Sequence, residues 1–199
     1  MEKQTSKVLY VDFCHTVVSR YTLGWYIRFI LFKRLKFLTL LLSRFKLLSF
    51  EDTVISAFKE LSHEKQNILS QEFSEKLLFF KKTEVINLIK EYKERNFKIV
   101  WVSAGMSEYI KKFDEIERIG AEKFITSSLV EKKFNKMYGD NKLKEILIFE
   151  ESKNISYKAA MSDHISDLPM LEYCDEAIVV SGPNTSLIKE AKKRDWKII

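Results

Sequence analysis

The sequence is short of the residues that most often interrupt a chain or cross-link it. Its 199 residues include only five Gly, two Pro and two Cys. With so few of them and a hydrophobic content of 46%, a disordered chain is excluded. The two cysteines, Cys14 and Cys174, are too few for a disulfide framework and fit a reducing compartment. At this length we expect one domain, or one domain that carries an insertion.

Three kinds of functional segment are also missing. The longest apolar runs fall far short of the roughly 20 residues that span a bilayer, and cations interrupt them. The opening residues, MEKQTSK, mix charges and lead into a strand, so we expect no export signal and a cytoplasmic protein. No stretch has the form of a Gly-rich loop that cradles phosphate. Any phosphate bound by this chain must therefore be held by other groups.

Acidic residues are absent from one long segment, residues 19–50. This segment contains seven cations and no Asp or Glu: Arg20, Arg28, Lys33, Arg34, Lys36, Arg44 and Lys46. Because the net charge of the whole chain is only +6, the excess of positive charge is local to this segment. Large aliphatic residues separate the cations, unlike in a solvated surface that follows a phosphate backbone, so we expect no nucleic-acid partner.

Two interpretations of this basic segment remain open. If residues 25–50 formed one continuous helix, all cations except Arg34 would fall within about half of its circumference and leave a broad apolar face. Such a helix packs inside a small helical domain or lies on a membrane surface. On a membrane, Trp25, Tyr26 and Phe29 would sit at headgroup depth, and the segment would dock on the inner face of the cytoplasmic membrane.

Apolar runs that end on polar residues indicate a parallel sheet. Residues 8–11 and 97–102 are apolar at nearly every position, as in strands covered on both faces. Further strands are expected at 124–126, through Met161, and over 176–180 as the last one. Helices are expected at 83–95 with Asn96 as the C-terminal cap, after Gly139, from Leu168 and over 186–196. This alternation predicts an α/β fold with a Rossmann-like, doubly wound parallel sheet.

The alternation fails only between Thr16 and Thr83, where helical patterns fill the gap. We therefore expect an all-helical cap over residues 17–82, inserted into a core formed by residues 1–16 and 83–199. In the core, right-handed crossovers bring the carboxyl ends of the strands to one edge.

Polar residues follow the strands at that edge. Asp12 ends the first strand, Ser103 ends the second, and Asp163 and Asp167 follow the strand through Met161, while Lys142 begins a helix. Carboxylates that converge on one edge would repel each other unless a hard cation such as Mg²⁺ lay between them. A hydroxyl and an ammonium at the same place suit a phosphoryl group.

This set of residues resembles the haloacid dehalogenase superfamily, and within it the phosphoserine-phosphatase-like branch with a helical cap. The resemblance covers nearly the whole chain. DFCHT at 12–16 is similar to the first motif of the family, VSAG at 102–105 to the second, and SDHISDLPML at 162–171 to the fourth, which is the most specific. Lys142 is the best match for the motif lysine, with Lys144 and Lys136 close enough to leave that assignment open.

The resemblance implies a role for each of these residues. Asp12 would be the nucleophile that attacks phosphorus and becomes an aspartyl phosphate. Mg²⁺ would be held by Asp12, the backbone carbonyl of Cys14, and Asp163, with Asp167 supporting its water ligands. Ser103, the backbone of Ala104, and Lys142 would bind phosphate oxygens, and Lys142 would also neutralise the nucleophile.

Cys14 departs from the family pattern. Phosphatases of the family carry a second Asp at this position, which protonates the leaving oxygen and later activates water. A thiol with an ordinary pKa near 8.5 is a poor substitute in both steps, and the loss of such a group typically costs about 10²- to 10⁴-fold in rate. His15 would point to the other side if the chain stayed extended. His164, beside a predicted metal ligand, is the closer candidate to replace it.

Three functions remain open on this sequence. One is a Mg²⁺-dependent phosphohydrolase that acts on a phosphomonoester. Another is a phosphotransferase or slow phosphatase, in which the aspartyl phosphate survives until an acceptor arrives. The third is a non-catalytic module that binds phosphate. The apolar and basic cap suits a small-molecule or lipid-linked phosphate, with an anionic headgroup on an apolar body.

Overall fold

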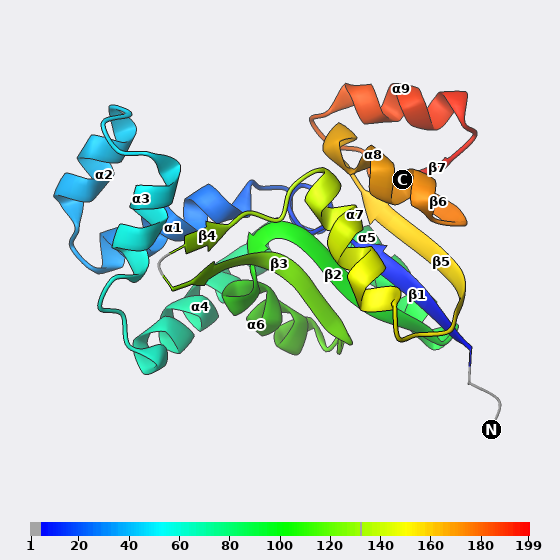
Figure 1. Cartoon of the computed structure of the whole chain (residues 1–199), viewed down its shortest axis with the longest axis horizontal. Coiled ribbons are helices and arrows are strands. Elements are labelled where there is room, and N and C mark those ends of the chain that lie inside the picture. The colour runs from blue at the N-terminus through cyan, green and yellow to red at the C-terminus, as the bar shows by residue number, and fades with distance from the viewer. Residues whose placement is uncertain (1–4, 132) are drawn as a thin grey trace.

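The computed structural model describes residues 5–131 and 133–199 and contains one seven-stranded sheet of order β4-β3-β2-β1-β5-β6-β7 (Figure 1). All neighbouring strands are parallel except β3 and β4. The strands are β1 (Ser6–Val11), β2 (Phe97–Met106), β3 (Lys123–Val130), β4 (Lys133–Asn135), β5 (Ile155–Ser162), β6 (Glu176–Val179) and β7 (Lys197–Ile198). The predicted α/β fold with a doubly wound sheet is confirmed.

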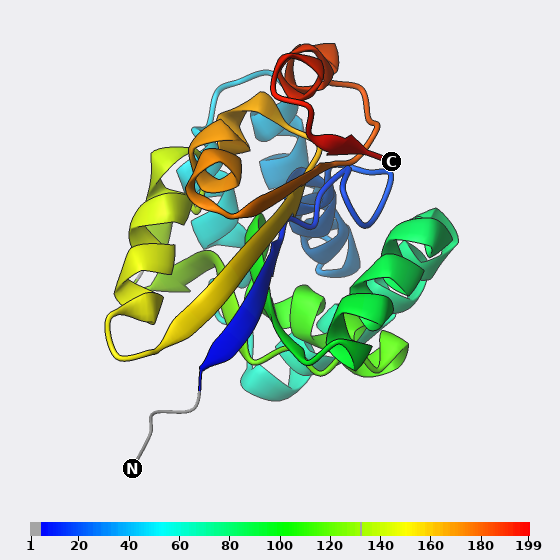
Figure 2. The same cartoon turned by 90° about the vertical axis from the view of Figure 1, so that its right-hand side faces the viewer.

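Helices cover both faces of the sheet (Figure 2). Helices α5 (Thr83–Glu94) and α6 (Ser107–Glu117) lie on one face, and α7 (Asp140–Glu150), α8 (Leu168–Tyr173) and α9 (Thr185–Lys193) lie on the other. Along β1, Leu9 and Val11 join one hydrophobic core while Val8 and Tyr10 join the other. A strand buried on both faces is apolar at successive positions, and for this reason the apolar runs of β1 and β2 could be predicted as strands from the sequence.

A helical insert connects β1 to α5, as predicted. It consists of α1 (Thr22–Lys33), α2 (Phe37–Arg44), α3 (Phe50–Phe58), α4 (His63–Leu77) and the short 3₁₀ helix η1 (Leu78–Phe80). The insert shares a core with the sheet, because Tyr26 of α1 packs its ring against Tyr109 of α6 at 4.8 Å between centroids. Division of the chain into two domains at 16/17 and 82/83 remains a prediction.

The single helix considered for residues 25–50 is wrong, because the segment forms α1, α2 and the start of α3. The breaks follow Leu35 and Lys46, which have left-handed φ angles of 55° and 56°. This is the usual conformation just past a helix end, where glycine is preferred. Asn96 after α5 and Asp195 after α9 adopt it too, with φ of 63° and 55°. Asn96 was predicted as a cap, but Leu35 and Lys46 are residue types that give no sequence signal for a helix end.

Other differences concern the edges of the sheet. Strand β3 runs from Lys123 to Val130, well beyond the predicted 124–126, because it pairs antiparallel with β4, which was not predicted. Strand β6 is not the last, since β7 pairs with it after α9. None of the described helices has the length and apolar character to cross a membrane.

Candidate active site

Asp12 lies at the centre of the sheet, immediately after β1. Val11 is aligned with Trp101 of β2 on one side and with Met161 of β5 on the other. The backbone N–H of Asp12 donates to the Met161 carbonyl at 2.9 Å, so the carboxylate is held by rigid backbone. From β1 the chain crosses to β2 on one side, and β5 joins on the other, which makes this edge the switch point where ligands bind in such folds.

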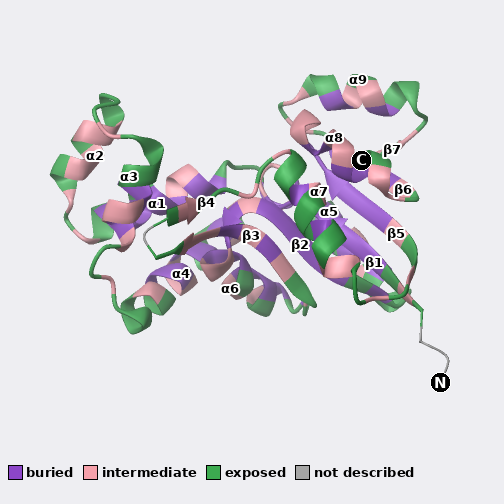
Figure 3. Cartoon of the chain, viewed as in Figure 1, coloured by how far each residue is buried: buried purple, intermediate pink, exposed green. Residues whose placement is uncertain are grey.

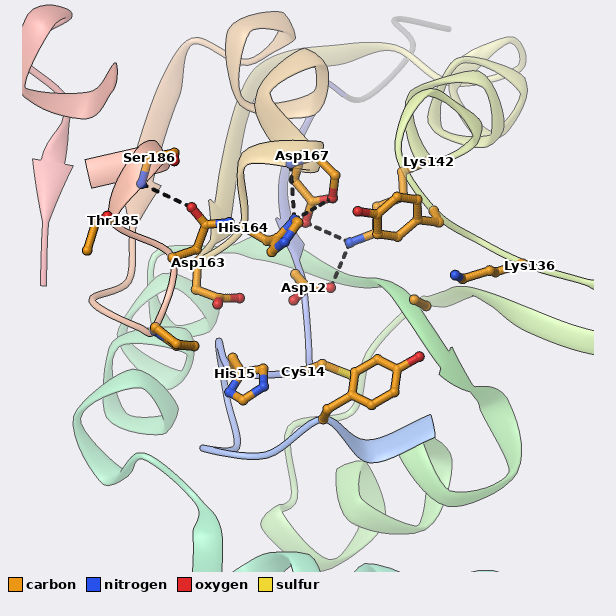
Figure 4. Close-up of a pocket in the computed structure, with 16 residues that line it drawn as sticks. Asp12, Cys14, His15, Lys136, Lys142, Asp163, His164, Asp167, Thr185 and Ser186 are labelled. Atoms are coloured by element: carbon orange, nitrogen blue, oxygen red, sulfur yellow. Dashed lines mark hydrogen bonds and ion pairs between the residues drawn. The ribbon is translucent and has the colours of Figure 1, made fainter. Parts of the chain in front are cut away.

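Lys142 connects two of the predicted acids. From the first turn of α7 its Nζ lies 2.7 Å from Asp12 Oδ1 and 2.7 Å from Asp167 Oδ2 (Figure 4). All three residues are buried, at 4% exposure or less. Lys144 is exposed and faces a different groove, whereas Lys136 is exposed and stacks on Tyr138 at the cavity wall. Of the three lysines, only Lys142 contacts the nucleophile candidate.

Thr16 connects Asp12 to Asp163 and had no assigned role in the sequence. Its Oγ1 lies 3.0 Å from Asp12 Oδ2 and 2.9 Å from Asp163 Oδ1, and it accepts the Asp163 backbone N–H at 3.0 Å. A hydroxyl has one proton and can donate it to only one of these carboxylates. Its position in DFCHT, four residues after Asp12, is the feature of the sequence that could have indicated this role.

Negative charge exceeds positive charge in this cluster. Burial raises the pKa of the Asp12 carboxyl to about 7; Lys142 lowers it, but Asp167 and Asp163 raise it again. Burial likewise raises the pKa of Asp163 to about 6, against the hydrogen bond from Thr16. Burial lowers the pKa of the Lys142 ammonium, but Asp12 and Asp167 together raise it above its usual value. Lys142 is therefore charged and pairs with Asp12 and Asp167, while the third buried acid, Asp163, has no contact with its ammonium.

The oxygen donors of this cluster suit a hard cation such as Mg²⁺. Asp12 and Asp163 offer carboxylate oxygens on either side of Thr16, and a cation beside them would balance the excess negative charge. Within 5–131 and 133–199, no three His, Cys, Asp or Glu side chains are grouped as a metal site. The predicted ligand set is compatible with this, since Asp167 turns to Lys142 and the third direct ligand would be a backbone carbonyl.

Cys14 lies two residues after Asp12 with its thiol turned into the protein. Its Sγ is 2.9 Å from Thr22 Oγ1, which in turn lies 2.6 Å from the Tyr109 hydroxyl. Burial raises the pKa of the Cys14 thiol to about 11, the nearby Asp12 raises it as well, and the hydrogen bond with Thr22 lowers it. The thiol is therefore protonated near neutral pH and has little strength as an acid or as a base.

Ser103 and Ala104 lie within β2, which continues past its predicted end to Met106 with an irregularity in its pairing after Ser103. Ser103 is fully buried, and its Oγ accepts the Gly105 N–H at 3.1 Å and lies 4.0 Å from Cys14 Sγ. Ala104 lines the cavity above Asp12, together with Asp12, Cys14, Lys142, Asp163 and Asp167. Six of the seven predicted site residues thus line one cavity, and Ser103 lies directly behind Cys14.

Both candidate histidines line that cavity as well. His15 has a left-handed φ of 57°, so the chain is not extended there and its side chain is not directed away as expected. His164 lies with Asp163 and Asp167 on the opposite side of Asp12 from His15 and Cys14 (Figure 4). Its Nδ1 lies 3.1 Å from the Ser166 N–H and accepts that hydrogen, which leaves the proton of the neutral ring on Nε2.

The cavity has a volume of about 610 Å³ and is walled mainly by loops of the core. Tyr138 and Lys136 come from the segment before α7, and residues 183–186 come from the start of α9. From the insert, among the described residues, only Tyr21 lines it. Residues 22–50, which hold most of the apolar and basic segment, do not line this cavity.

Gly182 is a further site residue that the sequence did not reveal. A Cβ built at this position would lie 3.0 Å from Asp163 Oδ2 and 3.1 Å from its Cβ. A larger residue would press on the Asp163 carboxylate, so the close approach favours glycine. Asn184, two residues later, accepts the Ser186 N–H at 3.0 Å through Oδ1 and begins α9 beside the cavity.

Comparison with known proteins places this site in a family. The chain matches no curated protein sequence. Among solved structures, a protein of unknown function from Bordetella pertussis Tohama I has a TM-score of 0.76 and 13% identity, with 98% of this chain and 99% of that chain covered. A phosphoserine phosphohydrolase-like protein from Francisella tularensis subsp. tularensis SCHU S4 has a TM-score of 0.64 and 19% identity, with 97% and 94% covered.

A phosphoserine phosphatase, solved as a phospho-aspartyl intermediate analogue, has a TM-score of 0.63 and 18% identity, with 98% of this chain and 93% of that chain covered. At these identities the likeness concerns the fold. The sequence itself matches the profile of haloacid dehalogenase-like hydrolases over residues 11–172, from the end of β1 to α8. The chain therefore belongs to the haloacid dehalogenase-like hydrolase family.

Proposed function

We propose that this protein is a Mg²⁺-dependent phosphohydrolase that cleaves a phosphomonoester through an aspartyl phosphate on Asp12. The observation that carries the proposal is the buried Asp12 carboxylate at the switch point of the sheet, held 2.7 Å from the Lys142 ammonium. A carboxylate at this position is a rigid nucleophile, and the ammonium offsets its repulsion of an incoming phosphate.

The reaction has two displacement steps at phosphorus. In the first, a carboxylate oxygen of Asp12 forms a bond to phosphorus while the ester P–O bond breaks, and the leaving oxygen takes the electron pair and a proton. In the second, water attacks the same phosphorus, loses a proton, and releases phosphate and the Asp12 carboxylate. Lys142 would hold a phosphoryl oxygen and Asp12 together in both steps.

Mg²⁺ would be held by Asp12, the Cys14 carbonyl and Asp163, and it would supply charge neutralisation at the phosphoryl oxygens. Asp167 holds Lys142 from the other side and accepts the Ser162 hydroxyl at 2.7 Å. Ser103, behind Cys14, and the backbone of Ala104, at the cavity wall, would complete the phosphate site.

Proton transfer is the step for which this chain is least equipped. The Cys14 thiol has a pKa raised by burial and turns to Thr22, so it cannot protonate an alkoxide efficiently. We assign this role to His164 at the cavity wall, which would give the proton as the imidazolium, with its Nδ1–H then turned to the Ser166 hydroxyl 2.8 Å away. Substrates with good leaving groups, which need no acid, should therefore react best.

Cys14 also favours a second candidate, a phosphotransferase or slow phosphatase. Hydrolysis of the aspartyl phosphate needs a base for water, and the buried neutral thiol is a poor one. The covalent intermediate would then persist until an acceptor hydroxyl enters the cavity. This reading predicts a rapid first turnover followed by slow release of phosphate.

The substrate we propose is a small phosphomonoester that reacts in the cytoplasm. The cavity of about 610 Å³ offers two tyrosine rings, Tyr21 and Tyr138, and the Lys136 ammonium around the body of the substrate. Both cysteines are free in the structure, which suits a reducing compartment.

Release of phosphate from a panel of esters tests the proposal. The panel should include phosphoserine, a sugar phosphate, p-nitrophenyl phosphate and acetyl phosphate, each with Mg²⁺ and with excess chelator. Mg²⁺-dependent release that is fastest for p-nitrophenyl and acetyl phosphate supports the hydrolase. A stoichiometric burst without turnover supports the transferase. Absence of both burst and release from every ester with Mg²⁺ would overturn the proposal.

A further inference from the structure

Helix α2 lies at the end of the insert farthest from the C-terminus (Figure 1). This end exposes many large apolar side chains. We call residues 32–50, from the end of α1 through α2 to the first residue of α3, the cap tip. Eight of its large apolar side chains are between 43% and 72% exposed: Phe32, Leu35, Phe37, Leu38, Leu41, Phe45, Leu47 and Phe50. Helix α2 contains no buried residue, and no part of it carries the buried colour in Figure 3.

This exposure is concentrated in the cap tip. Sixteen large apolar residues are exposed in the described ranges, and half of them belong to these 19 residues. Scattered exposed leucines are ordinary on soluble proteins, but a continuous apolar patch marks a contact surface. In α1, by contrast, Tyr26, Ile30 and Leu31 are fully buried, and from the cap tip Leu40 packs against the same core with a partly buried side chain.

The aromatic residues expected at a membrane belong to that core. Tyr26 and Phe29 are buried, and Trp25 packs its ring against Phe73 of α4 at 4.9 Å. They cannot reach a lipid headgroup while the insert is folded. The residues that can do so are the exposed ones of the cap tip.

The cations of the cap tip fall into two groups. Three are engaged within the insert, because Lys33 pairs with Glu72 at 2.6 Å, while Arg34 and Lys36 donate to carbonyls at the C-terminal end of α3. Arg44 and Lys46 are exposed and pair with no side chain of residues 5–131 and 133–199. These two lie next to Phe45 and Leu47, at the end of α2 and just beyond it.

We propose that the cap tip is a docking surface for a lipid bilayer with anionic headgroups. Its exposed leucines and phenylalanines would enter the boundary between headgroups and acyl chains, while Arg44 and Lys46 would contact the anionic headgroups. No acid lies between residues 19 and 50, so the cap tip itself carries no negative charge; the next acids along the chain are Glu51 and Asp52 in the first turn of α3. A second copy of this chain fits less well, since a symmetric contact would bring the same unpaired cations together.

Docking through the cap tip keeps the active site away from the bilayer. Helix α1 has 12 residues and is therefore about 18 Å long, with Thr22 beside Cys14 at one end and the cap tip at the other. The substrate can then be a soluble phosphomonoester that reaches a tethered enzyme. The inference concerns location and stands apart from the chemistry at Asp12.

Two variants and two matched controls test the docking surface. Arg44→Glu with Lys46→Glu reverses the unpaired charges, and Leu38→Ser with Leu47→Ser removes exposed apolar side chains. The matched charge control is Lys192→Glu with Lys197→Glu, since both lysines are exposed and lie outside the insert. The matched apolar control is Leu147→Ser with Ile148→Ser on α7, where both side chains are exposed.

The readout is co-sedimentation of the full chain with vesicles of phosphatidylglycerol and phosphatidylcholine, or of phosphatidylcholine alone. We expect binding to the anionic vesicles that falls as salt is added. Each cap-tip variant should weaken this binding about tenfold or more, and each control variant by less than about threefold. Equal loss in cap-tip and control variants would overturn the proposal, as would absence of binding to anionic vesicles at low salt.

The molecular mass in solution tests independently whether the cap tip contacts a second copy of the chain. Sedimentation velocity without lipid should give a monomer for the wild type and for both cap-tip variants. A dimer that dissociates in Leu38→Ser with Leu47→Ser, together with no binding to vesicles, would assign the cap tip to a second copy and overturn the membrane proposal. Hydrolysis of a soluble ester by each variant shows that the active site is intact.

Discussion

The two ends of helix α1 depart from ordinary protein surfaces in opposite ways. Near its first residues, three carboxylates and one ammonium are buried at the edge of the sheet. In its last turn and beyond it, eight large apolar side chains face solvent. Each arrangement costs folding free energy, since buried charges lose hydration and exposed apolar groups gain contact with water. Charged residues in the interior and large apolar residues in water are both unfavourable for folding, so such residues indicate functional surfaces.

The comparison also separates two uses of positive charge. Lys142 is buried and paired with two carboxylates, each 2.7 Å from its Nζ, so these two contacts fix the position of its ammonium. Arg44 and Lys46 are exposed and unpaired among the described residues, so their charge acts over a surface rather than at a point. The first arrangement suits chemistry on one phosphoryl group, and the second suits attraction to a plane of anions.

The largest effect is expected for Asp12→Asn. An amide has no anionic oxygen to attack phosphorus, so turnover should fall by at least about 10³-fold. The variant should stay folded, because the Lys142 ammonium keeps its ion pair with Asp167 while the cluster loses one of its three buried carboxylates. Initial rates and thermal unfolding check both points. Turnover near that of the wild type would remove Asp12 as the nucleophile.

Lys142→Met tests whether the buried ammonium holds the site together. Without it, Asp12 and Asp167 lie buried with no opposite charge, and unfolding should become easier by about 3–5 kcal/mol. Urea unfolding at neutral pH measures this difference. The matched variant Lys144→Met changes an exposed residue of the same helix and should shift stability by less than about 0.5 kcal/mol. Equal effects of the two substitutions would contradict the assignment of Lys142.

Cys14→Asp should raise the single-turnover rate of the first step by about 10²-fold with alkyl phosphates and leave that rate almost unchanged with p-nitrophenyl phosphate. A carboxyl group at this buried position, beside Asp12, would have a raised pKa and could donate a proton to an alkoxide. Cys14→Ser is the matched control, because it keeps the size of the side chain without supplying an acid. If Cys14→Asp shifts no substrate preference, His164→Gln becomes the variant to measure.

Much of the site could be predicted because its residues are tied to strand ends. The apolar runs before Asp12 and before Asp163 show that both residues follow buried parallel strands, and parallel strands end at the same edge. The lysine could not be chosen from sequence, since Lys136, Lys142 and Lys144 share one segment. Only the packing of α7 against the sheet determines that Lys142 enters the cluster.

The parts that could not be predicted depend on long-range contacts or on unmarked helix ends. Thr16 contacts Asp163 although 147 residues separate them in the sequence, and Gly182 approaches the same carboxylate from the loop before α9. The breaks at Leu35 and Lys46 occur at residues that favour helix or strand over a left-handed turn. They turn an apparent long helix into a buried α1 and an exposed α2, which is the difference that defines the cap tip.

The smallest expected effect concerns the apolar side chains of the cap tip, and it is measured on a matched pair of leucines. Leu47→Ala should change the free energy of unfolding by less than about 0.5 kcal/mol, because the side chain is 70% exposed and fills no cavity. Leu31→Ala, at a fully buried position of α1, should cost about 2–5 kcal/mol. Urea unfolding of both variants measures the two free energies, provided that the dependence of the unfolding free energy on urea concentration is the same for both. A cost for Leu47→Ala that approaches that of Leu31→Ala would mean that the cap tip is packed in solution. If that cost also grew with protein concentration, the packing partner would be a second copy of the chain, and a bilayer would no longer be needed to explain why these side chains are apolar.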